Sequence, residues 1–261
     1  MLVGYNLQVT MRQGARLLKL LFRRPGEFFD RVSGKADALL RRGEIPQNTG
    51  IPYEEGLRRF SQHLRADLAQ FCREAEVVGL KAHITAAKAT VKRPPSGIPH
   101  DADFGLAELC YAVCRAIKPE LVFETGVSNG VTTAFILQAL RINQRGALWS
   151  FDLPSLGVED QVGIFVPVEL KERWRLIYGS TRRTLLRELS QCGPVDLFLH
   201  DSLHTTKNMN FEFSAVWPHL RPGGVLMSDD VHRNLAFQNF VASRAKVQAV
   251  IWPSIGIALK P

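Results

Sequence analysis

The stretch between residues 195 and 231 limits the folds open to this chain more than any other part of it. Two short apolar runs, Val195–Leu199 and Gly224–Met227, follow Gly/Pro breaks and predict buried strands. The residues between them, Thr205–Leu220, are numerous enough for a helix that crosses from one strand to the next. Such a unit crosses over right-handed and leaves its two strands parallel. We therefore expect a parallel sheet.

The residues around this unit continue the alternation of helices and short strands. The expected helices are 103–117, 131–140 and 182–189, and the expected strands are 121–123, 147–151, 176–178, 247–252 and 255–259. Alternation of this kind is typical of a parallel sheet with helices on both faces. We predict an α/β domain with a doubly wound, Rossmann-like sheet over residues 96–261.

The N-terminal part differs in pattern and in charge. Residues 11–22 and 26–42 predict two short amphipathic helices separated by Pro25-Gly26. A longer helical stretch is expected over about 53–80, and residues 93–99 are typical of a linker. Residues 1–95 hold 17 Lys+Arg against 9 Asp+Glu, whereas the remainder holds 16 of each. We therefore predict an α-helical, basic extension or lid over residues 1–95.

That basic surface leaves several partners open. It could contact an anionic membrane, a second copy of the chain in a homodimer, or solvent alone, and a solvated face is the simplest interpretation. Nucleic acid is not expected as a partner, because aromatic residues do not interleave with the basic ones as a stacking platform requires. No export signal or spanning run is evident, so a cytoplasmic location is the default expectation. The four cysteines lack metal-binding spacing and are expected to be free thiols.

Three carboxylates follow the two strands of the first unit. Asp201 comes just after one strand, and Asp229 and Asp230 come after the other, so all three should lie at the edge where open α/β sheets bind ligands. Their mutual repulsion would be offset by a divalent cation such as Mg²⁺ or by basic side chains. The acids could instead cap the helices that follow them. Spacing alone does not decide between these roles.

A glycine-rich loop ends the first expected strand. Phe123–Gly130 contains Gly126 and Gly130 in a G-x-x-x-G spacing, directly before a helix whose N-terminus would favour anionic groups. The spacing lacks the G-x-G-x-x-G of a dinucleotide site, which counts against NAD. It also lacks the Gly-Lys-Ser/Thr of a Walker loop.

The next two strands end in residues that suit a nucleoside. Asp152 could accept both hydroxyls of a ribose, or be a turn residue before Pro154. Ser180 and Thr181 could contact a base, or cap the helix that follows them.

Taken in order, these residues resemble the class I methyltransferases that use S-adenosylmethionine, in particular the metal-dependent O-methyltransferase branch. The resemblance covers residues 100–261. It depends on FETGVSNGVTT, which is similar to the motif E-x-G-x-x-x-G, and on HDSLH, LRPGG and SDD. It implies the class I methyltransferase fold and S-adenosyl-L-methionine as cofactor. The residues that it implies in cofactor binding are Glu124, Thr125, Gly126, Ser128, Asn129, Gly130, Asp152, Ser180, Thr181 and Asp201.

The same resemblance implies a metal site and a base. Asp201, Asp229 and Asp230 would bind Mg²⁺ or another divalent cation. His204 would take the proton of the hydroxyl under attack, since the unperturbed pKa of histidine lies near neutrality. His204 could equally be a helix-capping or metal-neighbouring histidine.

The sequence thus predicts an S-adenosylmethionine-dependent O-methyltransferase that acts, with a divalent metal ion, on a hydroxyl of a small-molecule acceptor. Ser202 and Thr206-Lys207 depart from the residues usual in this branch and leave the acceptor undefined. The loop 153–167 and the N-terminal helices are expected to be lids over its pocket. Two alternatives stay open, which are a metal-independent methyltransferase of the same fold and a non-catalytic binding protein that acts through its basic N-terminal helices.

Overall fold

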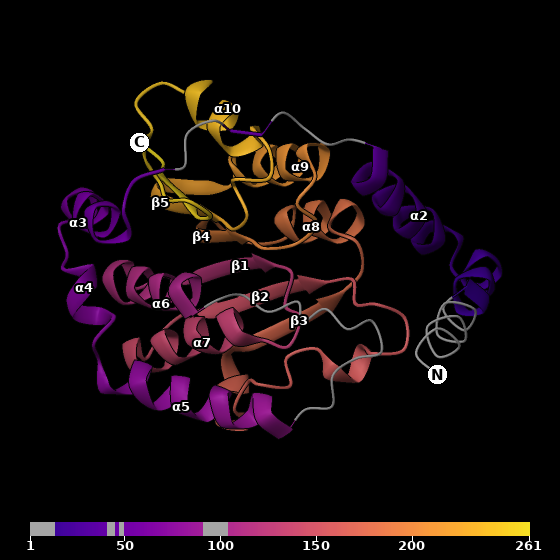
Figure 1. Ribbon diagram of the computed structural model, residues 1–261, viewed down its shortest axis with the longest axis horizontal. Coiled ribbons are helices and arrows are strands. Elements are labelled where there is room, and N and C mark those ends of the chain that lie inside the picture. Colours follow the sequence, from indigo (N-terminus) through magenta and orange to yellow (C-terminus); the bar gives the residue numbers. More distant parts are fainter. Residues whose placement is uncertain (1–13, 41–44, 47–49, 91–103) are drawn as a thin grey trace.

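A seven-stranded open sheet lies at the centre of the part of the chain that the computed structural model describes, which is residues 14–40, 45–46, 50–90 and 104–261 (Figure 1). The strands are β1 (Leu121–Thr125), β2 (Ala147–Asp152), β3 (Trp174–Tyr178), β4 (Val195–His200), β5 (Leu220–Ser228), β6 (Gln248–Ile251) and β7 (Gly256–Leu259). All the strands expected from the sequence are present. The strands β1 to β5 are one to five residues longer than predicted, and β6 and β7 are two and one residues shorter.

The strand order places a ligand crevice between β1 and β4. The order is β3-β2-β1-β4-β5-β7-β6, with β1 to β5 parallel and β7 antiparallel to β5 and β6. The chain moves outward from β1 through β2 to β3 and then returns to β4 on the other side of β1. In open α/β sheets, ligands bind at the carboxyl ends of the strands where the order reverses in this way.

Helices cover both faces of the sheet. They are α2 (Pro25–Leu40), α3 (Tyr53–Leu64), α4 (Leu68–Phe71), α5 (Ala75–Thr90), α6 (Phe104–Ile117), α7 (Val131–Asn143), α8 (Thr181–Leu189), α9 (Thr206–Val216) and α10 (Ala236–Ala242), and residues 14–23 are also helical. Successive strand residues alternate between two hydrophobic clusters: Val122 packs with α6 and α7, and Phe123 packs with α8, α9 and α10. The doubly wound prediction is therefore confirmed.

The helical stretch expected over about 53–80 is divided in the structure, because the segment forms three helices. Arg65 adopts a left-handed backbone conformation (φ 53°) that ends α3. The Asp67 side chain then accepts a hydrogen bond from the backbone N–H of Gln70 (3.1 Å) and caps the short α4. The helical spacing of apolar residues does not by itself indicate this break. The expected linker 93–99 and the domain boundary at residues 95/96 lie outside the described residues.

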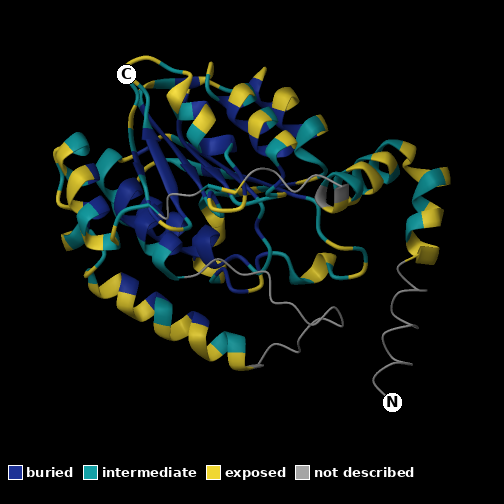
Figure 2. Ribbon diagram, turned by 45° about the horizontal axis from the view of Figure 1, so that its top comes forward, coloured by how far each residue is buried: buried dark blue, intermediate teal, exposed yellow. Residues whose placement is uncertain are grey.

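The N-terminal helices contribute little to the core. The break expected at Pro25-Gly26 falls one residue earlier, at Arg24, because proline is well suited to the first position of a helix. No described residue before Gly56 is buried, and Figure 2 shows the helices nearest the N-terminus in the colours of intermediate and exposed residues. Helices α3, α4 and α5 differ, since Phe60, Leu68 and Ile84 are fully buried in the hydrophobic cluster that also contains α6 and α7.

Two smaller expectations can be compared with the structure. The cysteines are free thiols, and Cys110 and Cys114 are buried in α6 as predicted. Within the described residues, no helix is both long enough and apolar enough to cross a bilayer.

Candidate active site

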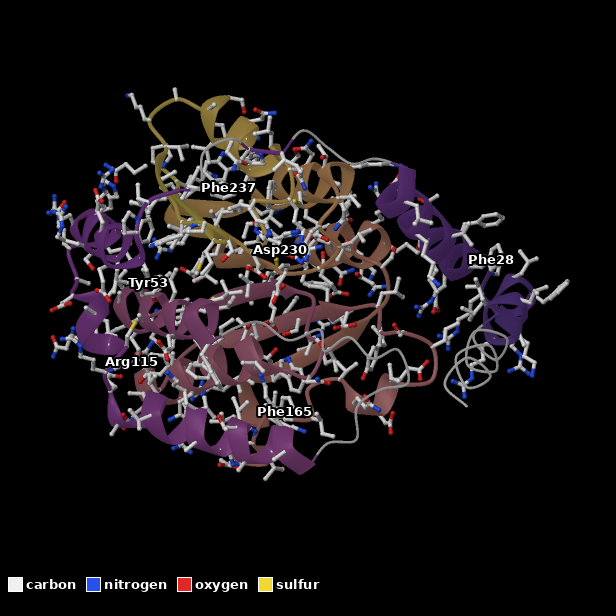
Figure 3. All side chains as sticks on the ribbon, in the orientation of Figure 1. Phe28, Tyr53, Arg115, Phe165, Asp230 and Phe237 are labelled. Carbon is white, nitrogen blue, oxygen red and sulfur yellow. The ribbon has the colours of Figure 1, made fainter. Side chains whose placement is uncertain are left out.

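The polar residues singled out in the sequence gather at the carboxyl edge of the sheet. The glycine loop follows β1, Asp152 ends β2, Asp201 follows β4, and Asp229 and Asp230 follow β5. Figure 3 labels Asp230 at this edge, near the middle of the molecule. The parallel strands therefore bring together residues that are up to 104 positions apart in the chain, from Gly126 to Asp230.

Gly126 is required where the loop leaves the sheet. Its φ is +83°, and a Cβ atom there would lie 2.0 Å from the backbone oxygen of Asp201. The backbone N–H of Asp201 in turn donates to the oxygen of Thr125 (2.8 Å). The loop and the end of β4 are thus in direct backbone contact, which only a residue without a side chain permits.

The loop 153–167 packs over the same glycine loop. Gly163 and Phe165 donate their backbone N–H groups to the oxygens of Ser128 and Asn129, both at 2.9 Å. Gly130 (φ +87°) is also constrained, because a Cβ there would lie 2.8 Å from the Cα of Gly163. The backbone oxygens of two predicted cofactor residues are therefore engaged by the covering loop.

Glu124 is a fully buried carboxyl beneath the loop. Its Oε2 atom accepts hydrogen bonds from the hydroxyls of Thr133 (2.8 Å) and Ser150 (2.6 Å), whereas Oε1 is buried without a hydrogen-bond partner among the described residues. Burial raises the pKa of Glu124 to about 7, and the hydrogen bonds from the two hydroxyls only partly oppose that change. The side chain thus offers one unsatisfied acceptor next to the crevice.

Asp152 organises the glycine loop from the end of β2. One of its oxygens, Oδ2, accepts the backbone N–H groups of Val127 (2.7 Å) and Ser128 (3.0 Å). Burial raises the pKa of this carboxyl, while these two hydrogen bonds and the charge of Arg31 act in the opposite direction. The side chain therefore has a defined structural role in addition to the ribose contact predicted for it.

The hydroxyls of Ser180 and Thr181 have partners within the protein. The Ser180 hydroxyl donates to Asp30 in α2 (2.8 Å), and the Thr181 side chain hydrogen-bonds to the carboxylate of Glu212. The alternative that either side chain caps α8 is wrong for Ser180, because that residue is the N-cap but makes no side-chain capping bond. Their contact with a base stays a prediction.

A cavity of about 590 Å³ lies between these residues and helix α2. Gly126, Asp152 and the Ser180-Thr181 pair line one side of it, and Asp30 to Asp37 of α2 contribute much of the other. Four polar contacts attach α2 to the body of the protein, and one of them is the hydrogen bond from the Ser180 hydroxyl to Asp30. Arg31 donates to the oxygen of Pro154 (2.8 Å), Asp30 pairs with Arg183 (2.5 Å), and Asp37 pairs with Lys207 (3.2 Å).

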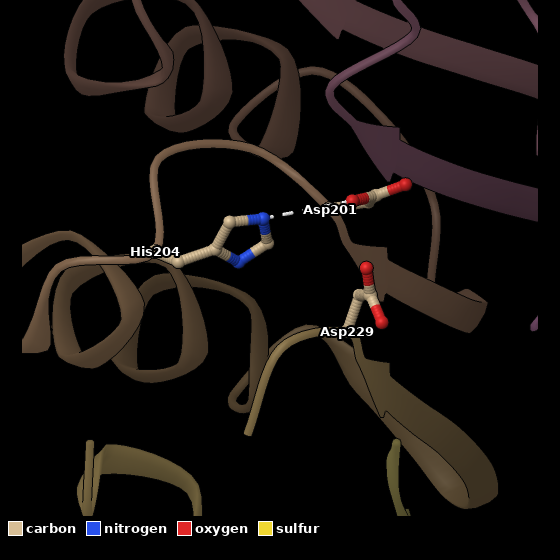
Figure 4. A group of neighbouring side chains, drawn as sticks. All are labelled: Asp201, His204 and Asp229. Carbon is tan, nitrogen blue, oxygen red and sulfur yellow. Dashed lines mark ion pairs between the residues drawn. The ribbon is translucent and has the colours of Figure 1, made fainter. Parts of the chain in front are cut away.

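Asp201, His204 and Asp229 form a group whose oxygen and nitrogen atoms converge. One donor atom from each lies within 4.8 Å of the others, and all three residues are partly buried. Figure 4 shows the two carboxylates beside one another and the His204 ring directed at Asp201, with Nε2 3.7 Å from Oδ1. Burial raises the pKa of Asp201 well above its usual value, and the neighbouring carboxylates of Asp229, Glu124 and Asp230 raise it further.

Asp230 lies beside this group but has another partner. Its backbone has φ +53°, and its carboxylate pairs with Arg233 at 2.6 Å. The Nε2 atom of His204 lies 3.5 Å from the same carboxylate oxygen. The third converging donor is therefore His204, and the charge of Asp230 is offset by an arginine.

The acids do not cap the neighbouring helices. Thr205 caps α9 by accepting the backbone N–H of Asn208 (3.3 Å). At the start of α10, the Asn234 side chain accepts the N–H of Ala236 (2.9 Å). The capping interpretation of Asp201, Asp229 and Asp230 is therefore wrong, because other residues fill that role.

His204 is held in its neutral form. Burial lowers its pKa to about 2, with further contributions from the nearby His200 and Arg233, and its Nδ1 atom is buried without a hydrogen-bond partner among the described residues. The Nε2 atom is the ring nitrogen that faces the carboxylates of Asp201 and Asp230. A neutral imidazole can be a metal ligand or a proton acceptor, although a pKa this low makes it a weak base.

Glu212 is a residue of the site that the sequence analysis missed. This fully buried carboxylate of α9 accepts hydrogen bonds from the Thr125 hydroxyl (2.6 Å) and the Ser202 hydroxyl (2.9 Å), and lies 2.7 Å from His200 Nδ1. It thereby joins the ends of β1 and β4. The available signal was its position four residues after Asn208, on the side of α9 that also carries the buried Met209 and Phe213.

Comparison with protein families identifies a matching domain in this region. Residues 123–231 match the family model described as a methyltransferase domain. The matched segment contains the glycine loop, Asp152, the converging group and Glu212. A search of the curated proteins gives no match to the chain.

Solved structures with a similar fold include three methyltransferases. An O-methyltransferase from Bacillus cereus in complex with SAH has a TM-score of 0.55 at 15% identity, over 70% of this chain and 90% of that one. The O-methyltransferase TomG from Streptomyces achromogenes, involved in tomaymycin synthesis and bound to SAM, has a TM-score of 0.52 at 15% identity, over 69% of this chain and 96% of that one. The SAH-bound Podospora anserina methyltransferase PaMTH1 has a TM-score of 0.51 at 14% identity, over 90% of this chain and 96% of that one. At these identities the likeness establishes a shared fold.

Proposed function

We propose that this protein transfers a methyl group from S-adenosylmethionine to a hydroxyl of a small-molecule acceptor. Residues 123–231 match a methyltransferase-domain model, and the sheet shares its fold with solved O-methyltransferases. The observation that carries the proposal is one juxtaposition. The cavity bordered by Gly126 and Asp152 reaches Ser202, which is the neighbour of the converging acid Asp201. A cofactor site and an acceptor site would therefore adjoin at the carboxyl ends of β1 and β4.

The residues around the cavity fit the cofactor. A cavity of about 590 Å³ lies within the range usual for small-molecule sites. Glu124 Oε1 is a buried oxygen without a partner among the described residues, and it suits an ammonium group of the ligand. Asp152 uses Oδ2 for the loop, which leaves Oδ1 as the atom we assign to ribose hydroxyls. When bound, S-adenosylmethionine supplies a sulfonium methyl group that the acceptor oxygen attacks as the hydroxyl proton leaves.

The converging group fits a divalent cation. Asp201, Asp229 and Nε2 of neutral His204 offer two carboxylates and an imidazole within 4.8 Å of one another, a spacing that lets one ion contact all three. An imidazole in the donor set makes a transition-metal ion such as Mn²⁺ or Zn²⁺ at least as suitable as Mg²⁺. When bound, the ion lowers the pKa of the acceptor hydroxyl and fixes its position.

The role of His204 as general base becomes one of two proposals for this residue. As a base, its Nε2 atom would take the hydroxyl proton directly. As a ligand, Nε2 would hold the ion and the proton would leave to Asp230 or to solvent. The depressed pKa favours the ligand role, because a histidine that remains neutral down to about pH 2 has little affinity for a proton.

Calorimetric titration with S-adenosylmethionine tests the cofactor first. We expect saturable binding to the wild-type chain and a large loss of affinity in Asp152→Asn, whose amide would no longer accept both loop N–H groups with full charge. Glu55→Gln, on the exposed face of α3, is the matched control and should bind like wild type. Absence of binding to the folded wild-type chain would favour the non-catalytic alternative.

Titration with Mn²⁺ and Mg²⁺ tests the metal, and product formation with and without chelator tests its role. Asp229→Asn should weaken metal binding at least about 100-fold. Asp230→Asn should weaken it less, because that carboxylate already binds Arg233. A chelator-resistant methyl transfer would instead favour the metal-independent alternative. His204→Gln distinguishes the two roles of the histidine, since loss of metal affinity marks a ligand and loss of turnover alone marks a base.

A further inference from the structure

The helices over residues 14–40 carry an apolar stripe on the side that faces away from the protein. Its members are large hydrophobic side chains exposed by 40% to 83%, namely Leu18, Phe22, Phe29, Val32 and Leu39. Phe22 and Leu39 are the most exposed, at 83% and 82%. Figure 2 shows this part of the chain projecting beyond the sheet and its covering helices. We call these five side chains the outer stripe.

The charges of the same segment are divided between its two sides. Residues 14–40 contain six Lys+Arg and three Asp+Glu. Each of the three acids is engaged: Glu27 pairs with Arg31 (2.7 Å), Asp30 with Arg183, and Asp37 with Lys207. Lys19 and Arg23, which alternate with Leu18 and Phe22 on the exposed side, form no ion pair with another described residue. The side turned to solvent therefore combines apolar residues with Lys19 and Arg23, and the side turned to the protein carries the three acids together with Arg31 and Lys35.

Packing among the described residues does not account for the outer stripe. Helix α2 is attached to the body by its other side, through Asp30, Arg31 and Asp37, and that side also lines the cavity. A helix that needed only to close the cavity could carry polar residues on its outer side. Apolar side chains this exposed, on consecutive helices, mark a surface that binds something.

We propose that the outer stripe and its flanking basic residues bind the surface of an anionic lipid bilayer. A helix with large apolar residues on one side and Lys/Arg beside them lies in the plane of a membrane interface, with its apolar side among the acyl chains and its cations near anionic headgroups. A second copy of this chain fits less well, because a twofold contact would bring Lys19 and Arg23 against the same basic residues. Nucleic acid also fits less well, because the exposed aliphatic side chains of Leu18 and Leu39 offer no favourable contact to a phosphate backbone.

This surface adds to the proposed function and does not depend on it. Because the inner side of α2 lines the cavity, a bilayer bound to its outer side would lie one helix diameter, about 10 Å, from the candidate cofactor site. The cavity would then open beside the lipid.

Flotation of the full-length protein with vesicles tests the proposal without any cofactor. We expect wild type to float with phosphatidylcholine vesicles that contain 30–40% phosphatidylglycerol, about tenfold less with pure phosphatidylcholine, and less as salt increases. The double variant Phe22→Asp/Leu39→Asp should lose at least about tenfold in vesicle affinity. Val168→Asp is the matched control, because Val168 is 80% exposed but lies outside this segment. It should float like wild type.

Since all substituted residues are exposed, every variant should retain the wild-type melting temperature, and that is measured alongside. Equal flotation of wild type and the double variant would overturn the proposal, as would equal loss in Val168→Asp. Size-exclusion chromatography with light scattering adds a further outcome: a wild-type dimer that the double variant dissociates, with no vesicle binding, would assign the outer stripe to a homodimer instead. Failure here leaves S-adenosylmethionine binding unaffected, so the two proposals fail separately.

Discussion

Two fully buried glutamates of the site have pKa shifts in opposite directions. Glu124 has a pKa raised to about 7, because burial is offset by only two hydroxyl hydrogen bonds. Glu212 has a pKa lowered to about 2, because His200 and the hydroxyls around it favour the carboxylate strongly enough to overcome burial. The first residue therefore costs stability at neutral pH, and the second contributes stability there.

This difference predicts opposite effects of the same substitution. In Glu124 the folded-state pKa exceeds that of the unfolded chain, so its stability is complete below about pH 4.5 and declines as the pH rises to about 7. Glu124→Gln should therefore have a higher free energy of unfolding than wild type between pH 5 and 8, by up to about 3 kcal/mol, and a correspondingly higher melting temperature. Glu212→Gln should lose melting temperature across that range, because the stability of the ionised form is present above pH 4.5. Parallel pH dependences for the two variants would contradict the assignment.

The proposed function explains why a buried carboxylate that lowers the free energy of unfolding stands at position 124. Its Oε1 atom has no hydrogen-bond partner among the described residues, and a bound cation would supply one. Glu124→Gln should thus bind S-adenosylmethionine more weakly while it melts at a higher temperature. Calorimetry on the same samples measures both quantities.

Gly126 gives a second prediction at the residue scale. Alanine there would meet the Asp201 backbone oxygen at 2.0 Å from a left-handed conformation, so Gly126→Ala should lose at least about 2 kcal/mol of unfolding free energy. Gly79, in helix α5, has open space around it, and Gly79→Ala should gain about 0.5–1 kcal/mol. Urea denaturation followed by circular dichroism measures both changes, and equal effects would contradict the close contact between the glycine loop and β4.

At the scale of helices and strands, most of the fold follows from local patterns. The strands are apolar runs bounded by Gly/Pro breaks, and β4, from Val195 to His200, is buried along its whole length as that pattern predicts. The end of α3 at Arg65 escaped prediction, because a left-handed cap on arginine has no strong sequence signal. The place of α2 also escaped it, since its attachments to Arg183 and Lys207 join residues about 150 positions apart or more.

The candidate site divides in the same way. Glu124, Asp152, Asp201 and Asp229 were found because strand ends are marked in the sequence. Glu212 was missed, since a single acid on a helix is normally solvated and its burial depends on three elements meeting.

The attachment of α2 predicts a protease-sensitive lid. Trypsin sites at Lys19, Arg23 and Lys35 lie on exposed positions of the N-terminal helices. If α2 closes over a bound ligand, S-adenosylhomocysteine should slow cleavage there severalfold, because the ligand stabilises the closed arrangement. Asp30→Asn, which weakens the contacts to Arg183 and Ser180, should be cleaved faster and should bind the ligand less tightly. Glu55→Gln, which removes an exposed ion pair in α3, is the control. Cleavage rates that change neither with S-adenosylhomocysteine nor in Asp30→Asn would contradict the lid.

The molecule as a whole separates a core from a working surface. Among the described residues, the buried hydrophobic side chains begin at Leu57 and extend to Ala258. Residues 14–40 supply none of them, yet line the cavity with one side and expose the outer stripe on the other. The positive charge in excess is concentrated in the same N-terminal part. Residues 14–40 therefore contribute to the candidate site and to the outer stripe and not to the hydrophobic core.

Removal of residues 1–40 tests this separation in a single variant. The shortened chain keeps both hydrophobic clusters, so its melting temperature should fall by no more than about 5 °C, which corresponds to one or two kcal/mol in a domain of this size. Its affinity for S-adenosylhomocysteine should fall at least about tenfold, because the cavity loses the wall formed by α2. Vesicle flotation should disappear with the outer stripe. Calorimetry and flotation measure the three quantities on one preparation. A shortened chain that unfolds would show that residues 14–40 belong to the core. A shortened chain that binds the ligand like wild type would show that α2 is not part of the site. The expected result is a stable fold that has lost both ligand affinity and vesicle binding, because the same helices form a wall of the cavity and the outer stripe.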